Sequence, residues 1–399
     1  MKIAVVIPKF GLVGGAEGFA AQLTAQLAGQ KDFEIHVFAH QWRRGDAPLI
    51  FHKVPVIRFP RFLKPFSFAY FAQRMIKSGA YHLVHSHDRI FQMDLLTMHG
   101  VPHKTWVEEA RGKPSSLFDR SMAWVERKGI AGPPIPMILP VSNLVKDELL
   151  RCYDIPEHKI QVIHPGISPD HFSALDRECC RNEIRQRHHL ASDDVLVLFV
   201  GMNFEIKRLD LVVKGVADLA KRGAGNANVK LVVVGKGRAE PYLTLARHLG
   251  IADRLIFAGV SHEIEKYYLA SDIFAMPSRY DTFGMAVLEA MMAGLPVIIT
   301  QKVGARDLVD CGIHGFTLKE TPSPLEISEK LTLLMEKNSR ITMGNNAQSR
   351  ALEHTWEKKA LQVAALYRSL PHDGDQNRHL PSKAYGSIGT WPDGTFRLS

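Results

Sequence analysis

The feature that most constrains the fold is a repeated alternation of short apolar, β-branched runs with longer helical stretches. The first unit is the run Lys2–Ile7, a turn that carries Gly14 and Gly15, and a stretch at Ala16–Ala28 with the apolar spacing of a helix. Further strand-like runs follow in two series, at 34–39, 82–85 and 137–141, and then at 195–200, 230–234, 255–258, 273–276 and 296–300. The sequence therefore predicts an α/β protein built from βαβ units with parallel sheets.

The length of the chain favours two domains. A chain of 399 residues, 46% of them hydrophobic, is too long for one ordinary core. A segment rich in Pro and Gly at 162–170 separates the two strand series. We predict Rossmann-like domains at 1–168 and 169–355, a terminal helix at 356–370, and a disordered tail at 371–399, which is rich in Gly, Pro, Ser and Asp. Open α/β sheets bind ligands at the carboxyl ends of their strands, so a cleft between the domains should hold the site.

Composition restricts the compartment and the partner. No apolar run approaches the roughly 20 residues that cross a bilayer, and no signal-peptide pattern precedes the first strand. The four cysteines have neither zinc-site spacing nor the density of a disulfide scaffold. We therefore expect a cytoplasmic protein. Its net charge of +9 indicates an acidic partner, which could be nucleic acid, a phosphorylated glycan or an anionic membrane surface.

The most informative motif runs from Ser278 to Ile298. A predicted strand ends before it, a loop carries Asp281 and Gly284, and a helix follows. The helix N-terminus would present unsatisfied N–H groups to an anion such as a diphosphate, and these groups belong to Phe283, Gly284, Met285 and Ala286. Asp281 and Glu289 could then hold the hydroxyls of a sugar and of a ribose. In isolation, Asp281 could equally be a helix cap and Glu289 an ordinary helix carboxylate.

The surrounding residues favour the functional interpretation. Together with the downstream strings at 304–309 and 312–316, the motif resembles glycosyltransferase family 4, whose signature is two glutamates separated by seven residues, the second within a Leu-Glu-Ala helix. The resemblance implies a retaining enzyme of GT-B fold, in which two Rossmann-like domains face a central cleft and the C-terminal helix returns to the N-terminal domain. Such an enzyme moves a hexose from a nucleotide sugar, here a UDP-sugar, to a glycan or glycolipid acceptor.

The resemblance also assigns roles to individual residues. The first acid contacts the transferred sugar and the second the ribose, so Asp281, one methylene shorter than the usual Glu, inherits a catalytic position and Glu289 a donor-binding one. In the family an Arg and a Lys neutralise the donor diphosphate. Lys207 occupies the Lys position, Met202 replaces the Arg, and Arg208 stands where a Gly is usual and is the candidate for the missing cation. The alternative is a solvated Lys-Arg surface.

The loop after the first strand matches the Gly-Gly loop of the family but not a dinucleotide-binding fingerprint. Gly14 and Gly15 would let the backbone approach the donor phosphates, and Glu17 would support the loop or face the sugar on the acceptor side. An ordinary tight turn is the alternative. The family also places a strand-terminal histidine beside the donor sugar, and His99 best matches it, with His87 next.

No metal ion or other cofactor is expected. The histidines at 85, 87, 99 and 103 do not repeat a ligand spacing. The Asp-x-Asp spacing that metal-dependent transferases use occurs at Asp373-Gly374-Asp375, in the predicted tail. The helix dipole and Lys207 would therefore stabilise the diphosphate without metal.

Shorter strings, Gln41–Pro48 and Ile163–Asp170, resemble bacterial lipopolysaccharide core glucosyltransferases. Aromatic and basic residues mix at Arg61–Lys77 and again at 103–128, which suggests peripheral contact with an anionic membrane at its cytoplasmic face. Equally, the aromatics could be core and the cations their solvated rim, since Pro65 would interrupt an amphipathic helix. A UDP-N-acetylglucosamine 2-epimerase on the same fold is the alternative enzyme. A nucleic-acid partner is not expected, because the cations and aromatics form no recognisable binding module.

Overall fold

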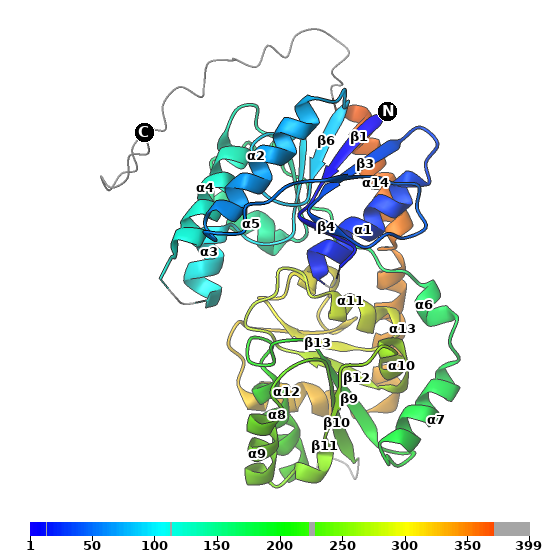
Figure 1. Cartoon of the computed structure of the whole chain (residues 1–399). Coiled ribbons are helices and arrows are strands. Elements are labelled where there is room, and N and C mark those ends of the chain that lie inside the picture. Colours follow the sequence, from blue (N-terminus) through cyan, green and yellow to red (C-terminus); the bar gives the residue numbers. More distant parts are fainter. Residues whose placement is uncertain (13, 112–113, 223–227, 371–399) are drawn as a thin grey trace.

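The computed structural model describes residues 1–12, 14–111, 114–222 and 228–370, with the side chains of 109–111 excepted. Within these residues the chain forms two α/β domains, one above the other in Figure 1, each around its own parallel sheet. This confirms the predicted fold class. The predicted tail at 371–399, with Asp373-Gly374-Asp375, lies outside the described residues. No helix in the described part of the chain is both long and apolar enough to cross a membrane.

The first sheet has six parallel strands in the order β5-β3-β1-β6-β7-β8. Their bounds are Ile50–Lys53 (β5), Glu34–Ala39 (β3), Lys2–Val6 (β1), Leu83–Ser86 (β6), Leu95–Met98 (β7) and Met137–Pro140 (β8). Val5 of β1 is in register with Val37 on one side and His85 on the other. The central strands are buried, as expected for a parallel sheet covered by helices on both faces. A short pair, β2 (Lys9–Phe10) and β4 (Gln41–Trp42), lies beyond the ends of β1 and β3.

The second sheet repeats the same strand order with the later part of the chain, β11-β10-β9-β12-β13-β14. The strands are Leu255–Gly259 (β11), Val229–Val234 (β10), Val195–Val200 (β9), Ile273–Met276 (β12), Val297–Thr300 (β13) and Gly315–Leu318 (β14). In each sheet the order of addition reverses beside the first strand, between β1 and β6 and between β9 and β12. Such a reversal leaves a crevice at the carboxyl ends of these strands.

The helices pack in pairs that cover the sheets. In the N-terminal domain α2 packs on α4, and in the C-terminal domain α8 packs on α12, α7 on α10 and α11 on α13. Their bounds are Gly15–Ala28 (α1), Leu63–Lys77 (α2), His103–Thr105 (α3), Leu117–Ala131 (α4), Asn143–Cys152 (α5), Asp170–Ser173 (α6), Arg177–Arg187 (α7), Leu209–Lys221 (α8), Glu240–Leu249 (α9), Ile264–Ala270 (α10), Met285–Met292 (α11), Pro324–Leu333 (α12), Lys337–Leu352 (α13) and Trp356–Ser369 (α14). Short 3₁₀ turns lie at Glu157–Lys159, Ala252–Arg254 and Gly304–Leu308, and a π-helical segment at Trp106–Arg111.

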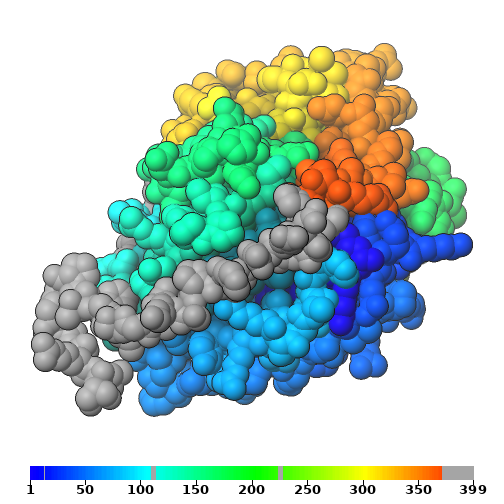
Figure 2. All heavy atoms as spheres, turned by 90° about the horizontal axis from the view of Figure 1, so that it is seen from above, coloured from blue at the N-terminus to red at the C-terminus, as the bar shows by residue number. Residues whose placement is uncertain are grey.

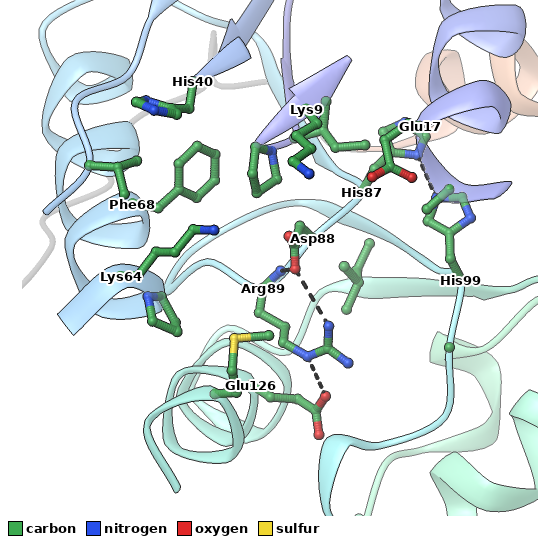
Figure 3. A pocket seen from close by; sticks show the side chains of 18 of the residues that line it. Lys9, Glu17, His40, Lys64, Phe68, His87, Asp88, Arg89, His99 and Glu126 are labelled. Carbon is green, nitrogen blue, oxygen red and sulfur yellow. Dashed lines mark hydrogen bonds and ion pairs between the residues drawn. The ribbon is translucent and has the colours of Figure 1, made fainter. Parts of the chain in front are cut away.

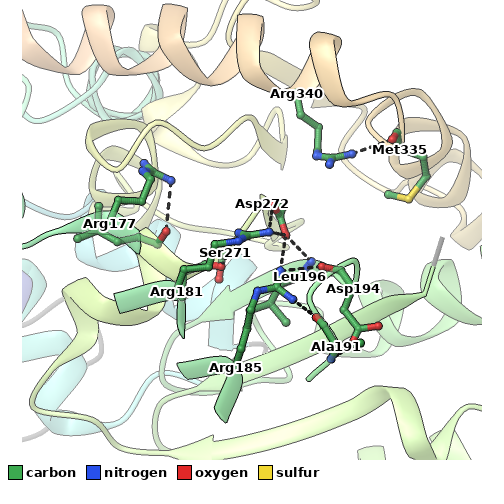
Figure 4. A network of polar contacts seen from close by, with 12 residues as sticks. Arg177, Arg181, Arg185, Ala191, Asp194, Leu196, Ser271, Asp272, Met335 and Arg340 are labelled. Atoms are coloured by element: carbon green, nitrogen blue, oxygen red, sulfur yellow. Dashed lines mark hydrogen bonds and ion pairs between the residues drawn. The ribbon is translucent and has the colours of Figure 1, made fainter. Parts of the chain in front are cut away.

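Arginines of α7 hold this helix against neighbouring elements of the C-terminal domain (Figure 4). Arg177 donates to the carbonyls of Leu269 and Ala293, and Arg181 donates to the carbonyl of Ala270 at 3.0 Å. These carbonyls lie at the C-terminal ends of α10 and α11, where a positive charge is favoured by the helix dipole. Arg177 and Arg181 therefore fix α7 in place, and their guanidinium groups already have acceptors within the protein.

The final helix, α14, returns to the N-terminal domain, as predicted (Figure 1). It packs on α1, and the Tyr367 hydroxyl shares a hydrogen bond of 2.6 Å with Nδ1 of the buried His85. Seen from above, the orange-red surface of α14 borders the blue surface of the N-terminal segment (Figure 2). The two crossings between domains run side by side, since the Ile167 N–H donates to the His354 carbonyl at 2.9 Å. A domain boundary near residue 168 remains our proposal.

Candidate active site

The loop between β12 and α11 forms the C-terminal side of the candidate site. Gly284 caps the helix with φ 91°, in the left-handed region that glycine adopts at little cost. The loop is held against the chain that follows β13, because the Asp281 carbonyl accepts the Gly304 N–H at 2.9 Å and the Phe283 carbonyl accepts the Ala305 N–H at 2.7 Å. The helix begins at Met285, so Phe283, which was predicted to belong to the first turn, lies before the helix.

The N-terminus of α11 leaves donors open. The Val287 N–H returns to the Gly284 carbonyl at 2.9 Å. Within the described residues, the N–H groups of Met285 and Ala286 have no acceptor, and the carbonyls one turn back, of Asp281 and Thr282, accept instead from the Gly304 N–H and the Ser142 hydroxyl. Free N–H groups at the positive end of a helix dipole suit a bound anion.

Lys207 and Asp281 meet across the reversal point of the second sheet. Lys207 follows β9 and Asp281 follows β12, and the Lys207 ammonium donates to the Asp281 carboxylate in a partly buried ion pair. The sequence predicted a phosphate contact for one and a sugar contact for the other. The structure brings both groups to one place, at the loop that precedes the open helix N-terminus.

Arg208 adopts an unusual backbone conformation. Its φ of 57° lies in the left-handed region, which explains why glycine suits this position in the family. Its guanidinium pairs with Asp210 in the first turn of α8, at 3.0 Å. Arg208 would have to leave this carboxylate to act as the second diphosphate cation, so that role stays a prediction.

Glu289 lies in the second turn of α11 and is partly buried. Its Oε2 accepts the Tyr268 hydroxyl at 2.7 Å, and burial raises the pKa of the carboxyl above its ordinary value. The bond to Tyr268 orients the carboxylate, a contact that the sequence did not reveal.

On the N-terminal side, Gly14 caps α1 and Gly15 is its first residue. A Cβ added at Gly14 would overlap Oε2 of Glu17, whereas one at Gly15 would meet no atom within 4 Å. The Glu17 carboxylate therefore lies close against the Gly14 backbone, and Gly15 leaves the start of the helix open.

Three histidines near the reversal point of the first sheet have different environments. His85 lies in the core between Tyr367 and Thr97, so its role is structural. His87 follows β6 and His99 follows β7, and their rings share a hydrogen bond of 3.1 Å between Nδ1 of His87 and Nε2 of His99. Burial, with Arg89 nearby, lowers the pKa of His99 to about 3. Burial likewise holds the pKa of His87 far below its ordinary value, so both rings are neutral near pH 7.

A cavity of about 770 Å³ opens beside these residues. Glu17, His87 and His99 all line it, so the structure unites the three predicted acceptor-side residues (Figure 3). Lys207, Asp281 and Glu289 do not line it. The sequence interpretation missed several charged lining residues, and only their position after strands or in the aromatic-basic segments could have signalled them: Lys9, Arg58, Arg61, Lys64, Asp88, Arg89 and Glu126.

The two halves of the site are joined directly. The Ser142 hydroxyl, at the cap of α5, donates to the Thr282 carbonyl at 2.6 Å, and the Asn143 N–H donates to Asp307 at 2.6 Å. Thr282 neighbours Asp281, so the N-terminal domain contacts the donor-side loop itself. Among the described residues, no group of three His, Cys, Asp or Glu side chains is placed to hold a metal ion.

Two family models match consecutive parts of this chain. The model described as Glycosyltransferase Family 4 matches residues 13–171, and the model described as Glycosyl transferases group 1 matches residues 181–350. The two ranges correspond to the two sheets and together span most of the sequence. The chain belongs to glycosyltransferase family 4. The resemblance noted from the sequence is thereby confirmed, and the epimerase alternative gains no support from these matches.

Relatives with curated descriptions are also glycosyltransferases. An uncharacterized glycosyltransferase of Methanocaldococcus jannaschii is 26% identical over 58% of this chain and 59% of that protein, so the match spans less than two thirds of that relative. A D-inositol 3-phosphate glycosyltransferase of Corynebacterium jeikeium is 28% identical over 76% of each chain.

Solved structures confirm the GT-B fold of this glycosyltransferase. WaaG, a glycosyltransferase involved in lipopolysaccharide biosynthesis, superposes with a TM-score of 0.76 at 21% identity, covering 92% of this chain and 100% of WaaG. HepE of Anabaena, in a complex with UDP and glucose, superposes with a TM-score of 0.69 at 16% identity, covering 93% and 100%. At these identities the likeness concerns the fold alone.

The low pKa of His99 makes a testable prediction about stability. The unfolded chain binds a proton near the ordinary value of 6.5, whereas the folded protein keeps His99 neutral down to about pH 3. Acid therefore favours unfolding, and stability falls as the pH decreases from 6.5 toward 3. At pH 5 the contribution of one such histidine is roughly 2 kcal/mol. We expect His99→Gln to lose less stability than the parent between pH 7 and pH 5.

Thermal unfolding midpoints at the two pH values provide the measurement. The exposed His158 gives a matched control, because His158→Gln removes a histidine that is not enclosed. An unchanged acid sensitivity in His99→Gln would contradict the partly buried, neutral state assigned to this ring.

Proposed function

We propose that this glycosyltransferase moves a hexose from a UDP-sugar to a glycan or glycolipid acceptor with retention of the anomeric configuration. The observation that carries the proposal is the loop between β12 and α11. There the open N–H groups of Met285 and Ala286, the Lys207 ammonium and the Asp281 carboxylate are gathered at the reversal point of one sheet. A diphosphate and the sugar attached to it would use these groups together.

The proposed donor complex assigns a role to each group. The diphosphate would lie at the N-terminus of α11 and draw Lys207 away from Asp281, since a phosphate carries more charge than a carboxylate. Asp281 would then accept hydrogen bonds from hydroxyls of the transferred sugar. Glu289, oriented by Tyr268, would accept hydrogen bonds from the ribose. UDP is favoured because the structural relative HepE binds it, and the base itself is not assigned.

In the proposed transfer the bond between the anomeric carbon and the diphosphate oxygen breaks, and a bond to the acceptor hydroxyl forms on the same face. The hydroxyl proton passes to the departing phosphate oxygen. Lys207 and the helix N–H groups stabilise the charge that develops on that oxygen, and preorganised donors of this kind usually give the largest share of catalysis. No covalent intermediate on the protein is invoked.

The acceptor is proposed to occupy the cavity of the N-terminal domain. Glu17 and His99 line it next to the Gly14-Gly15 loop. A neutral His99 can donate or accept a hydrogen bond but brings no charge, so we assign it the positioning of hydroxyl groups. Similarity in fold to WaaG makes lipopolysaccharide core a candidate acceptor, proposed on that ground alone.

Peripheral contact with an anionic membrane is proposed for the face formed by α2 and α4. Phe66, Tyr70 and Trp124 are each 38–45% exposed there and pack on one another, with ring centroids 5.9 Å apart for Phe66 and Trp124. Pro65 does not interrupt this helix, which corrects the expectation from the sequence. Pro65 lies in the first turn of α2, where its missing N–H is not required.

The donor assignment predicts a specific ligand response. We expect one nucleotide sugar from a panel of UDP- and GDP-sugars to raise the melting temperature, and EDTA to leave that rise intact. Glu289→Ala should abolish most of it, because a ribose contact to a charged group contributes about 1.5–3 kcal/mol. Thermal shift measurements check this, with Glu329→Ala on α12 as the control. Release of UDP without any acceptor glycan, together with an epimerised sugar, would instead indicate an isomerase.

The membrane assignment predicts binding to vesicles. We expect the protein to co-sediment with phosphatidylglycerol vesicles at low salt, less with phosphatidylcholine, and less still after Phe66→Ser with Tyr70→Ser. Leu361→Ser on α14, also an exposed apolar residue, is the control. Equal sedimentation of the double variant and the parent would remove this face as the contact.

A further inference from the structure

The cavity of the N-terminal domain is positively charged. Its lining carries five cationic side chains against three carboxylates, Glu17, Asp88 and Glu126. All of these residues come from the first 130 positions of the chain, so the cavity belongs to this domain alone. A site for a neutral glycan would not require an excess of cations, which must be desolvated when a ligand enters.

Two of the three carboxylates, Asp88 and Glu126, share one cation, Arg89. Arg89 donates from Nε to Glu126 at 2.7 Å and lies 3.5 Å from Asp88. Glu126 also accepts the Tyr153 hydroxyl at 2.8 Å and the His103 N–H at 3.0 Å. Burial among these partners raises the pKa of the Tyr153 hydroxyl, so Tyr153 stays a donor. Arg89 is therefore held by carboxylates of the protein itself, and the other four cations of the lining remain available to a ligand.

These four cations have no carboxylate partner among the described residues. Arg58 donates to Nε2 of His40 at 3.2 Å, and Arg61 lies over the ring of Phe118, 6.0 Å from its centroid. Lys9 and Lys64 form no ion pair in the same part of the chain, and both are exposed to the cavity solvent. Apolar neighbours such as Phe68 line the wall beside Lys64, which reduces the screening of its charge.

The charged groups are separated within the cavity. In Figure 3, Glu17 and His99 lie at one end, Lys64 and His40 lie at the other, and Lys9 lies between them. The amine of Lys64 points into the open space. A ligand that spans the cavity therefore meets hydroxyl-binding groups at one end and cations at the other.

We propose that the acceptor of this glycosyltransferase carries a phosphate group, bound by Lys64, Lys9 and Arg61, while its reacting hydroxyl lies at the Glu17 and His99 end. The inference rests on the proposed function. A phosphate ester carries nearly two negative charges at pH 7, which matches the surplus of positive charge in the cavity lining better than a single carboxylate does. The donor diphosphate has its own cation, Lys207, outside this cavity.

The test measures binding of a phosphorylated sugar to the full-length protein. Titrations of glucose 6-phosphate, glucose and glucuronate are followed by NMR in the presence of saturating UDP. We expect glucose 6-phosphate to bind best, and Lys64→Gln or Lys9→Gln to weaken it roughly tenfold, the factor that a hydrogen bond to a charged group contributes. Lys31→Gln, an exposed lysine of the same domain outside the cavity, should leave the affinity unchanged.

Other outcomes would overturn the inference. Equal affinity for glucose and glucose 6-phosphate, or equal losses in Lys31→Gln and Lys64→Gln, would do so. A loss in Lys64→Gln that appears only with phosphatidylglycerol vesicles would assign these cations to lipid. UDP is titrated separately in every variant. If Lys64→Gln weakens the binding of UDP, the cavity is the donor site and the proposed function is wrong about its place. If UDP binds normally but sugar phosphates do not bind, the proposed function stands and the phosphorylated acceptor is excluded.

Discussion

The parallel order of both sheets, with its reversal beside the first strand, is the constraint on which the rest of the structure depends. Because β1 pairs with both β3 and β6, and β9 with both β10 and β12, the loops after these strands diverge and leave space at the carboxyl edge. The site residues follow these four strands: Lys9 and Gly14 after β1, His87 after β6, Lys207 after β9 and Asp281 after β12. One topological rule, used twice, therefore places both halves of the site.

The two halves differ in electrostatics. On the C-terminal side a single ion pair, Lys207 with Asp281, lies before an open helix N-terminus. On the N-terminal side burial keeps His87 and His99 unprotonated beside the Glu17 carboxylate, and Lys64 lies at the opposite end of the cavity. Such a separation suits a reaction in which one ligand departs as an anion and the other attacks as a neutral hydroxyl.

Local patterns predicted much of this arrangement. The buried strands β9 and β12 were predicted with their observed bounds, because each is an unbroken apolar run of the length typical of a buried strand. The strands β5, β7 and β14 were missed; each is four residues long, and β5 and β14 lie at the edges of their sheets. The motif around Asp281 predicted a helix N-terminus near residue 284, and the helix begins at Met285 with Gly284 as its cap.

The side-chain partners could not be predicted. Lys207 and Asp281 are 74 positions apart, and only the pairing of β9 with β12 brings them together. The hydrogen bond from the Tyr268 hydroxyl to Glu289 and the ion pair of Arg89 with Glu126 likewise depend on how the helices pack. The cationic cavity escaped notice for the same reason, because Lys9 and Lys64 come from separate elements that only the fold brings to one cavity.

A crystal structure of the protein with UDP tests the central claim most directly. The account predicts that the diphosphate lies at the N-terminus of α11 in contact with Met285 and Ala286, that Lys207 has moved from Asp281 to a phosphate oxygen, and that the ribose contacts Glu289. A diphosphate bound instead among Lys9, Arg61 and Lys64, with the Lys207–Asp281 pair intact, would contradict it.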